Sequence, residues 1–305
     1  MWGSVILLFA NELISNGSSH LSGYKDIVTF QDKYIAIGAD GRIDNISIHG
    51  ESITIDSSCQ SKLNSAYANA NLFIAVGEHG SVIYSTDGNA FIRAESGTNK
   101  NINGITTKNG LIIAGAEDGT LLASRDAKVW HLIKTNAKGN ILSLSSNNSL
   151  FIGVTDAGEI IKSTDGVKWE IRDYNKEYAG YNPYSKFKKI LAVDYNIIII
   201  GTHEDGSPSI LSSSLGNVWA ERLSVYFDEE DNINHLTSVP ADITYDPDRD
   251  QFILACKNGE LFTLPSCSKC NKLIKISEID LNAILYNNNL LLIGDADYSV
   301  LIQRL

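Results

Sequence analysis

The chain has 305 residues, of which 43% are hydrophobic and 20% are charged, so its composition is that of a folded globular protein and not of a disordered one. Its formal net charge is −11, which makes nucleic acid a poor candidate partner, because phosphate binding requires a basic surface. No apolar run approaches the roughly 20 residues that span a bilayer, and four cysteines are too few for a disulfide scaffold of this size.

The first predicted element is a short strand near the N-terminus, Val5–Phe9. This apolar run is short and has no positively charged segment before it, so it does not resemble a signal peptide. If Met1 is the native start, we expect a protein that is cytoplasmic on synthesis. The abundance of Asn and Ile is typical of AT-rich genomes and favours a bacterial or phage origin, with a virion-associated protein as one hypothesis.

A repeat of 39 residues runs through the chain. Gly41, Gly80, Gly119 and Gly158 are spaced 39 residues apart, and each lies between two short runs rich in β-branched and aliphatic residues. This pattern predicts a strand, a glycine turn and a strand, with one further strand before each pair and one after it. Four short strands in about 40 residues is the spacing of a β-propeller blade. The predicted pairs are Leu72–Gly77 with Ser81–Ser85, Leu111–Gly115 with Thr120–Ser124, and Leu150–Gly153 with Glu159–Ser163.

Two insertions lengthen the repeat in the second half of the chain. The next turn glycines, Gly206 and Gly259, follow after 48 and 53 residues, and removing the surplus leaves about seven units. The surplus falls at 173–187 and at 225–242, each between the fourth strand of one blade and the first strand of the next. In a propeller such connections lie on the same face as the turns between second and third strands, so we expect the two insertions to meet.

The last predicted strands are Leu281–Tyr286, Leu290–Gly294 and Val300–Leu305, which leave the final blade one strand short. Val5–Phe9 precedes the first blade, and we expect it to complete the last one, so that no edge stays open between blades. We therefore predict an all-β fold in one domain, 1–305. It is a seven-bladed β-propeller with four-stranded antiparallel blades, closed by the N-terminal strand.

Three blades carry nearly the same turn after the third strand. The Asp carboxylate is placed to accept backbone N–H groups, Gly permits a positive φ, and the aromatic ring covers the turn. A fourth turn, at 212–219, keeps the Ser and the Trp and lacks the Asp. The residues predicted to hold these turns are Ser85, Asp87, Phe91, Ser124, Asp126, Trp130, Ser163, Asp165, Trp169 and Trp219.

These turns resemble the Asp-box, or BNR, repeat, Ser-x-Asp-x-Gly-x-x-Trp in its usual form, and are one residue shorter. The resemblance covers the second to fifth blades and implies a propeller of the WD40/YVTN/BNR-like superfamily. Propellers with such boxes include sialidases, other glycoside hydrolases, sortilin-type receptors, photosystem II assembly factors and many bacterial and phage proteins. The box is a folding device in all of them, so the resemblance implies the architecture and not a particular activity.

The insertions are the first candidate binding region, because long loops on a rigid scaffold concentrate binding residues and Tyr is a good contact residue for sugars and proteins. The alternative is a pair of solvated loops whose tyrosines fold onto the blade edge. With the adjacent turn of the fifth blade, the candidate binding residues are Tyr174, Tyr178, Tyr181, Tyr184, His203, Glu204, Asp205, Tyr226, Phe227, Asp228, Glu229, Glu230 and Asp231.

The turns between second and third strands also carry acids in six of the seven blades. Such a ring could attract a cation or a basic partner, although Asp is also simply a good turn residue. Cys267 and Cys270 form a Cys-x-x-Cys pair with no second pair to complete a zinc site, and we interpret it as a replacement turn. We expect no metal, no cofactor and no catalytic residue. Sialidase chemistry is disfavoured, because the Arg residues lie at peripheral positions.

The leading functional hypothesis is a non-catalytic binding or assembly module. It would recognise a protein partner or a cell-surface glycan, with a phage tail or virion as the favoured context and a larger assembly as its setting. The alternatives are a glycoside hydrolase with carboxylates in the central mouth and an assembly chaperone similar to the photosystem II factors. Facing carboxylates in the mouth would favour the enzyme, and a broad tyrosine-rich ledge would favour the binder.

Overall fold

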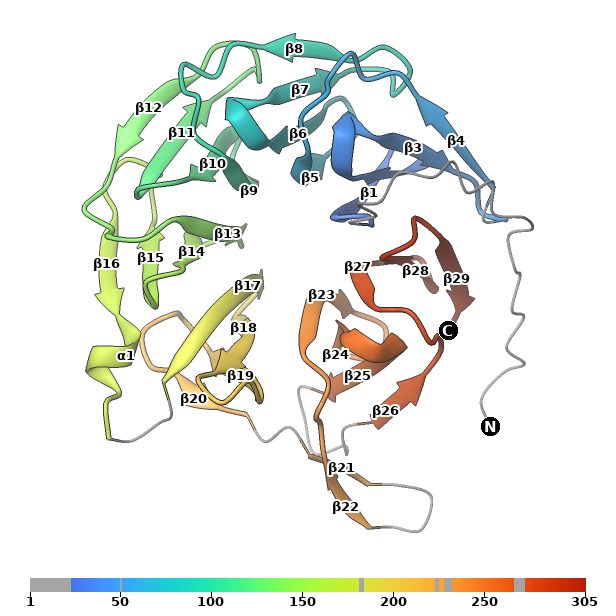
Figure 1. Ribbon diagram of the computed structural model, residues 1–305. Coiled ribbons are helices and arrows are strands. Elements are labelled where there is room, and N and C mark those ends of the chain that lie inside the picture. The colour runs from blue at the N-terminus through green and yellow to red at the C-terminus, as the bar shows by residue number, and fades with distance from the viewer. Residues whose placement is uncertain (1–22, 50, 181–183, 223–224, 228–231, 266–271) are drawn as a thin grey trace.

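Seven small antiparallel sheets stand in chain order around a central axis in the computed structural model (Figure 1). The structure describes residues 23–49, 51–180, 184–222, 225–227, 232–265 and 272–305. Among these residues six sheets have four strands and the seventh has three, in the order of a β-propeller. The chain is therefore a seven-bladed β-propeller, as the 39-residue repeat predicted.

Within each blade the strands run from the axis outward in chain order. Those of the first four blades are β1 (Asp26–Phe30), β2 (Lys33–Ile37), β3 (Ile43–Ile46), β4 (Ser52–Ile55); β5 (Leu63–Ala68), β6 (Phe73–Gly77), β7 (Val82–Ser85), β8 (Ile92–Ala94); β9 (Ile102–Lys108), β10 (Leu111–Ala116), β11 (Thr120–Ser124), β12 (His131–Lys134); β13 (Ile141–Ser146), β14 (Phe151–Thr155), β15 (Glu159–Ser163) and β16 (Glu170–Asp173).

The two insertions lie before and after the fifth blade. Their strands are β17 (Ser185–Val193), β18 (Asn196–His203), β19 (Pro208–Ser213), β20 (Ala220–Glu221); β23 (Pro240–Asp246), β24 (Gln251–Cys256), β25 (Glu260–Pro265), β26 (Lys272–Lys275); β27 (Leu281–Asn287), β28 (Leu290–Asp295) and β29 (Val300–Arg304). The insertions add α1 (Tyr174–Glu177) and the hairpin of β21 (Val225–Phe227) and β22 (Ile233–His235).

The repeated glycine is required by a close approach of two chain segments. Gly80 has φ of 68°, and a Cβ on it would lie 1.8 Å from the carbonyl oxygen of Thr98 in the connection to the next blade. Gly41 meets Cys59 in the same way, at 1.7 Å. A side chain would therefore clash with backbone as well as strain the turn. Gly119 and Gly259 approach the carbonyl oxygens of Ala137 and Ser277 in the same way, so the contact recurs in four of the blades.

Each blade buries both faces against its neighbours. In β18 the side chains of Ile197 and Ile199 pack in the cluster shared with the fourth blade, and those of Ile198 and Ile200 pack in the cluster shared with the sixth. A strand covered on both sides needs a continuous apolar run instead of alternation. The Ile-rich sequence of this strand follows from that position.

The innermost strands are sheet edges, and side chains from the preceding blade cap their backbone N–H groups. Asp26 Oδ2 accepts a hydrogen bond of 3.0 Å from the N–H of Ala66, and Asp242 Oδ2 accepts one of 2.9 Å from the N–H of Ile284. Ser143 Oγ is placed in the same way toward Ile190, at 3.3 Å. These bonds link consecutive blades and satisfy groups that an open edge would leave unpaired.

The ring closes by packing of the seventh blade against the first. Tyr24, fully buried just before β1, takes part in the core cluster shared with β27 and β28, and its hydroxyl donates to Asp44. Its backbone N–H donates to the carbonyl of Asp295 at 3.2 Å. The predicted strand Val5–Phe9 lies outside the described residues, so its place beside β29 stays a prediction.

Candidate functional site

The two faces of the ring carry different kinds of turn. We call the face with the second-to-third-strand turns and the blade-to-blade connections the turn face. The opposite face, with the third-to-fourth-strand turns, is the box face. The channel along the axis opens between the first residues of the innermost strands on the turn face. The sequence-predicted residues divide between these two faces.

The box residues bond within their own turns on the box face. Asp126 Oδ1 accepts hydrogen bonds from the N–H groups of Lys128 and Val129, both 2.9 Å, and these donors hold the pKa of Asp126 below its usual value. Ser124 Oγ accepts from the N–H of Ala127 at 3.0 Å, and the Trp130 indole donates to the carbonyl of Ala127 at 2.9 Å. The same Ser and Asp contacts occur in the turns of Ser85 with Asp87 and of Ser163 with Asp165.

The aromatic residues of these turns pack into the gaps between blades. Trp130 is 8% exposed and belongs to the core cluster between the second and third blades. Trp169 and Phe91 are half-buried against Phe151 and Phe73, respectively. Trp219, in the fourth turn that lacks the Asp, is 4% exposed. All four rings therefore serve packing, and Trp169 also lines a pocket of about 510 Å³ on the box face.

Two tyrosines of the first insertion pack toward the core and do not form an exposed ledge, which corrects the expectation for these two residues. Tyr174 is 1% exposed and stacks on Tyr178 with ring centroids 4.7 Å apart, within the core between the fourth and fifth blades. The reason is local: Asp173 caps the single turn α1 through the N–H of Lys176, and this turn directs both tyrosines inward. Tyr184 is exposed, and Tyr181 lies outside the described residues.

The second insertion forms a hairpin at another blade. Tyr226 is half-buried against the core between the fifth and sixth blades, and β21 contacts β26. Phe227 belongs to β21, and Asp228, Glu229, Glu230 and Asp231 lie outside the described residues. Because α1 contacts β15 and β16 of the fourth blade, α1 and the hairpin lie apart (Figure 1). The ends of the insertions lie in β17 and β23, which contact each other. The expectation that the insertions meet is therefore wrong for α1 and the hairpin.

The predicted turn of the fifth blade is split between exposed and inward-facing residues. His203 Nε2 lies 3.2 Å from Glu221 Oε1, with the imidazole only 13% exposed. Burial raises the pKa of Glu221. Glu204 and Asp205 are exposed, and Asp205 Oδ1 accepts from the N–H and the hydroxyl of Ser207, which lower the pKa of Asp205. Glu204 and Asp205 therefore belong to the surface of the turn face.

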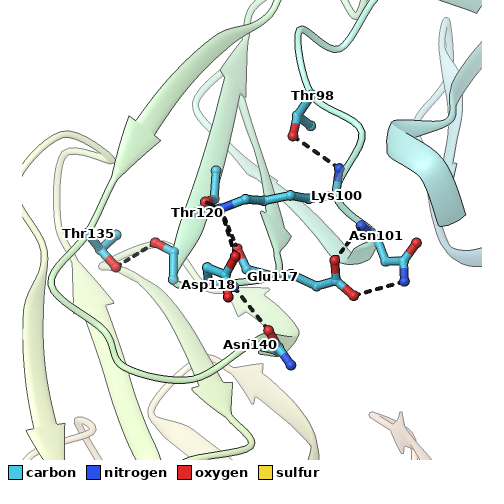
Figure 2. Close-up of polar contacts among 9 residues, drawn as sticks. Thr98, Lys100, Asn101, Glu117, Asp118, Thr120, Thr135 and Asn140 are labelled. Carbon is cyan, nitrogen blue, oxygen red and sulfur yellow. Dashed lines mark hydrogen bonds and ion pairs between the residues drawn. The ribbon is translucent and has the colours of Figure 1, made fainter.

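Several acids of the turn face hold the blade-to-blade connections in place. Glu117 accepts hydrogen bonds from the backbone and side-chain N–H groups of Asn101, at 3.1 and 2.8 Å (Figure 2). Asn140 accepts one from the N–H of Asp118 at 3.0 Å and donates to Asp156. These carboxylates are engaged in turn geometry, and this favours that interpretation over a free anionic ring.

The channel mouth is a pocket of about 190 Å³ to which all seven blades contribute. In six blades the strand register shifts near the start of the innermost strand, so one residue is bulged there. A bulge re-aims side chains locally, and here the bulged residues line the channel. The lining residues are Lys25, Asn64, Ser65, Asn103, Leu142, Ser143, Lys188, Lys189, Ala241 and Asn282.

All charged residues among those lining the mouth are lysines. Lys189 is ion-paired with the buried Asp242. The side chain of Lys188 is exposed to the solvent in the channel. The walls of the channel nevertheless desolvate its ammonium group, and this lowers the pKa of Lys188 to about 8. Lys257, Lys189 and Lys25 lower the pKa further by repulsion, while Asp242 opposes them. The mouth is thus locally cationic in a protein of net charge −11.

Sequence reasoning missed this lysine group. The signal was present in the spacing, because Lys25, Asn64, Asn103 and Leu142 follow one another at 39 residues. Lys188 holds the equivalent bulged position of the fifth blade, directly after the first insertion. Aligning the starts of the innermost strands, as well as the turn glycines, would have brought these positions together.

Comparisons with known proteins give the fold. No protein-family model matches the sequence, and no curated protein matches it. Similar solved structures include a catalytically inactive virginiamycin B lyase from Staphylococcus aureus with quinupristin, at 13% identity and a TM-score of 0.76, covering 95% of this chain and 97% of that one. The WD40 propeller domain of Doa1 has 14% identity and a TM-score of 0.70, covering 94% of both chains. YCF48 bound to D1 peptide has 14% identity and a TM-score of 0.68, covering 94% and 93%.

Searches of the described residues for two other kinds of site were negative. None of the helices there is long and apolar enough to cross a membrane. Within the same residues, no group of three or more His, Cys, Asp or Glu side chains is arranged to hold a metal ion. Cys59 and Cys256 are buried and free, whereas Cys267 and Cys270 lie outside the described part of the chain.

Proposed function

We propose that this propeller is a non-catalytic module that binds a protein partner through its turn face. The observation that carries the proposal is the contrast between the faces. The box face carries self-bonded turns with hollows of about 510 and 560 Å³ between them, and its charged turn residues bond within the turns. The turn face combines exposed side chains such as Glu204 and Asp205 with the cationic channel mouth. A rigid ring that presents loops and an open mouth on one face is suited to recognition.

Two similar propellers support a protein partner over a glycan. One is a WD40 domain, and the other was solved with a peptide bound. A glycan has less support, because Tyr174 is buried in the core and Tyr178 packs half-buried against it. The Asp-box resemblance and the Asn- and Ile-rich composition still support a bacterial or phage setting, in which the partner would belong to a larger assembly.

The hydrolase alternative lacks a suitable pair of carboxylates among the described residues of the mouth. Asp26 accepts hydrogen bonds from Ser65 and from the N–H of Ala66, and Asp242 is bound to Lys189 and to the N–H of Ile284. Both are structural acceptors, and neither is placed to activate a water. The pocket volume of about 190 Å³ is also below the roughly 300–1,000 Å³ usual for ligand sites.

The test compares two charge-reversed variants of the full chain as bait in an extract of the source organism. Glu204→Lys with Asp205→Lys changes the turn face, and Lys128→Glu with Lys168→Glu changes the box face at exposed lysines. We expect a protein retained by the unmodified chain and by the box-face variant to be lost from the turn-face variant. Loss from the box-face variant alone would contradict the proposal. Circular dichroism and melting curves establish that both variants fold.

A further inference from the structure

We propose that the channel mouth binds one small oxyanion, a phosphate or a carboxylate group, beside Lys188 and Lys25. The proposal concerns a ligand site and does not depend on the identity of a protein partner. It rests on the composition of the pocket, on the charges around it and on its size.

The pocket lining is suited to an anion. Its charged members are Lys25, Lys188 and Lys189, and its polar members are three Asn and two Ser side chains. Asn64 and Asn103 each donate one amide hydrogen to the carbonyl of the next blade, Ile102 and Ile141, at 3.0 Å. These bonds fix the amides at the wall, and each amide nitrogen carries a second N–H. Ammonium and amide donors that line one pocket are suited to an oxyanion.

No described residue balances the positive charge of Lys188. Lys189 is balanced by Asp242, Lys257 lies 3.0 Å from Asp280 Oδ2, and Lys62 lies 3.5 Å from Glu78 Oε1. For Lys188 the described residues provide neither a hydrogen bond nor an ion pair. Burial and three neighbouring lysines disfavour its charged form. A bound anion would relieve that repulsion, so the crowding of cations is explained if the mouth has an anionic ligand.

The size of the pocket limits the ligand to a small anion. At about 30 Å³ for each liquid water, 190 Å³ holds only about six waters. A phosphate or a carboxylate with part of its hydration fits this space, which is smaller than the roughly 300–1,000 Å³ usual for ligand sites. The net charge of −11 also opposes the approach of a long polyanion. A single oxyanion is therefore the ligand class that agrees with both charge and volume.

The test is calorimetric titration of the full chain with inorganic phosphate and with succinate, at low ionic strength and pH 7. Lys188→Met removes the charge and keeps the length of the side chain, and Lys168→Met is the matched control at an exposed lysine of the box face. We expect Lys188→Met to weaken binding of the probe anions by about tenfold or more and Lys168→Met to bind as the unmodified chain. Equal affinity in both variants, or no measurable binding to either probe, would overturn the proposal.

A pH series adds an independent measurement. The groups that face Lys188 from the surrounding elements are Lys25, Lys62, Lys189, Lys257, Asp26, Asp242 and Asp280. Since the pKa of Lys188 is about 8, binding of succinate should weaken between pH 7 and pH 9 in the unmodified chain. This decline should be much smaller in Lys188→Met. An equal decline in both would contradict the assignment to Lys188.

A third titration distinguishes a free anion from an acidic side chain of a docked peptide. The probe is an acetylated and amidated Gly-Glu-Gly peptide, whose only carboxylate is that of the side chain. Tighter binding of this peptide than of succinate would support the site and assign the carboxylate to a protein ligand. Binding of phosphate and succinate alone would support the site and assign it to a free anion.

Discussion

The hydroxyl oxygen of Tyr178 lies 2.9 Å from the backbone nitrogen of Trp219 and accepts its N–H. Tyr178 belongs to the insertion after the fourth blade, and Trp219 ends the one box-like turn that has lost its Asp. The insertion therefore ties this turn to the preceding blade. A residue that the sequence suggested as a ligand contact instead holds two blades together.

Replacing Tyr178 by Phe tests this structural role. The ring still stacks on Tyr174, but the N–H of Trp219 loses its acceptor in a partly buried place. We expect the free energy of unfolding to fall by about 1–2 kcal/mol. Tyr184→Phe, at an exposed tyrosine of the same insertion, is the control and should change the free energy by less than about 0.5 kcal/mol. Equal stability of both variants in urea denaturation would show that the bond contributes nothing.

Trp130 should be among the most sensitive positions of the box face. Its ring is 8% exposed in the core between two blades, and its indole donates to Ala127. Trp130→Ala should lower the free energy of unfolding by about 3–5 kcal/mol, because it leaves a cavity and removes packing. The neighbouring Val129 is 58% exposed, so Val129→Ala should be nearly neutral. Thermal melts of the two variants provide the comparison, and similar melting temperatures would refute a packing role.

The three box aspartates should contribute to acid sensitivity. Backbone N–H donors lower the folded-state pKa of Asp87, Asp126 and Asp165 below the usual 3.8. The folded state therefore binds fewer protons than the unfolded chain near this pH. Their contribution is fully present above the unfolded pKa and is lost as the pH falls through the folded one. Replacing all three by Asn should flatten the loss of stability below pH 4, measured by denaturant midpoints. If the variant loses stability below pH 4 as steeply as the unmodified chain, these bonds do not contribute to acid sensitivity.

Removing residues 1–10 tests the closure that the sequence predicts. β29 pairs only with β28 among the described residues. If Val5–Phe9 forms the fourth strand there, its removal exposes the edge of β29, and the truncated protein should aggregate or self-associate. Light scattering and melting curves report this outcome. A monomeric truncation with an unchanged melting temperature would place Val5–Phe9 elsewhere.

The fold could be read from the sequence because its signals repeat for a physical reason. Gly41, Gly80, Gly119 and Gly259 recur at one position of the blade, since a side chain there would collide with the backbone of the next connection. The insertion tyrosines carry no such periodic signal, so only the capped turn after Asp173 shows that Tyr174 faces inward. The lysines of the mouth could not be predicted from the alternation of side chains along a strand. The bulge at Lys188 changes the side of the strand on which the side chain lies, and alternation does not predict that bulge.

The bulge at the start of the innermost strand in six blades affects how the residues of the channel mouth can be substituted. The strand pairing resumes directly after the bulged residue. The side chain at the bulge can therefore be substituted without changing the strand pairing that forms the blade. Lys188, Leu142 and Ala241 occupy equivalent positions with unrelated chemistries. The chemistry of the channel mouth thus depends on single residues, each of which can be substituted independently of the others. Substitution at a few such positions could convert a cationic opening into a neutral or acidic one, and ligand preference could evolve stepwise without redesign of the ring.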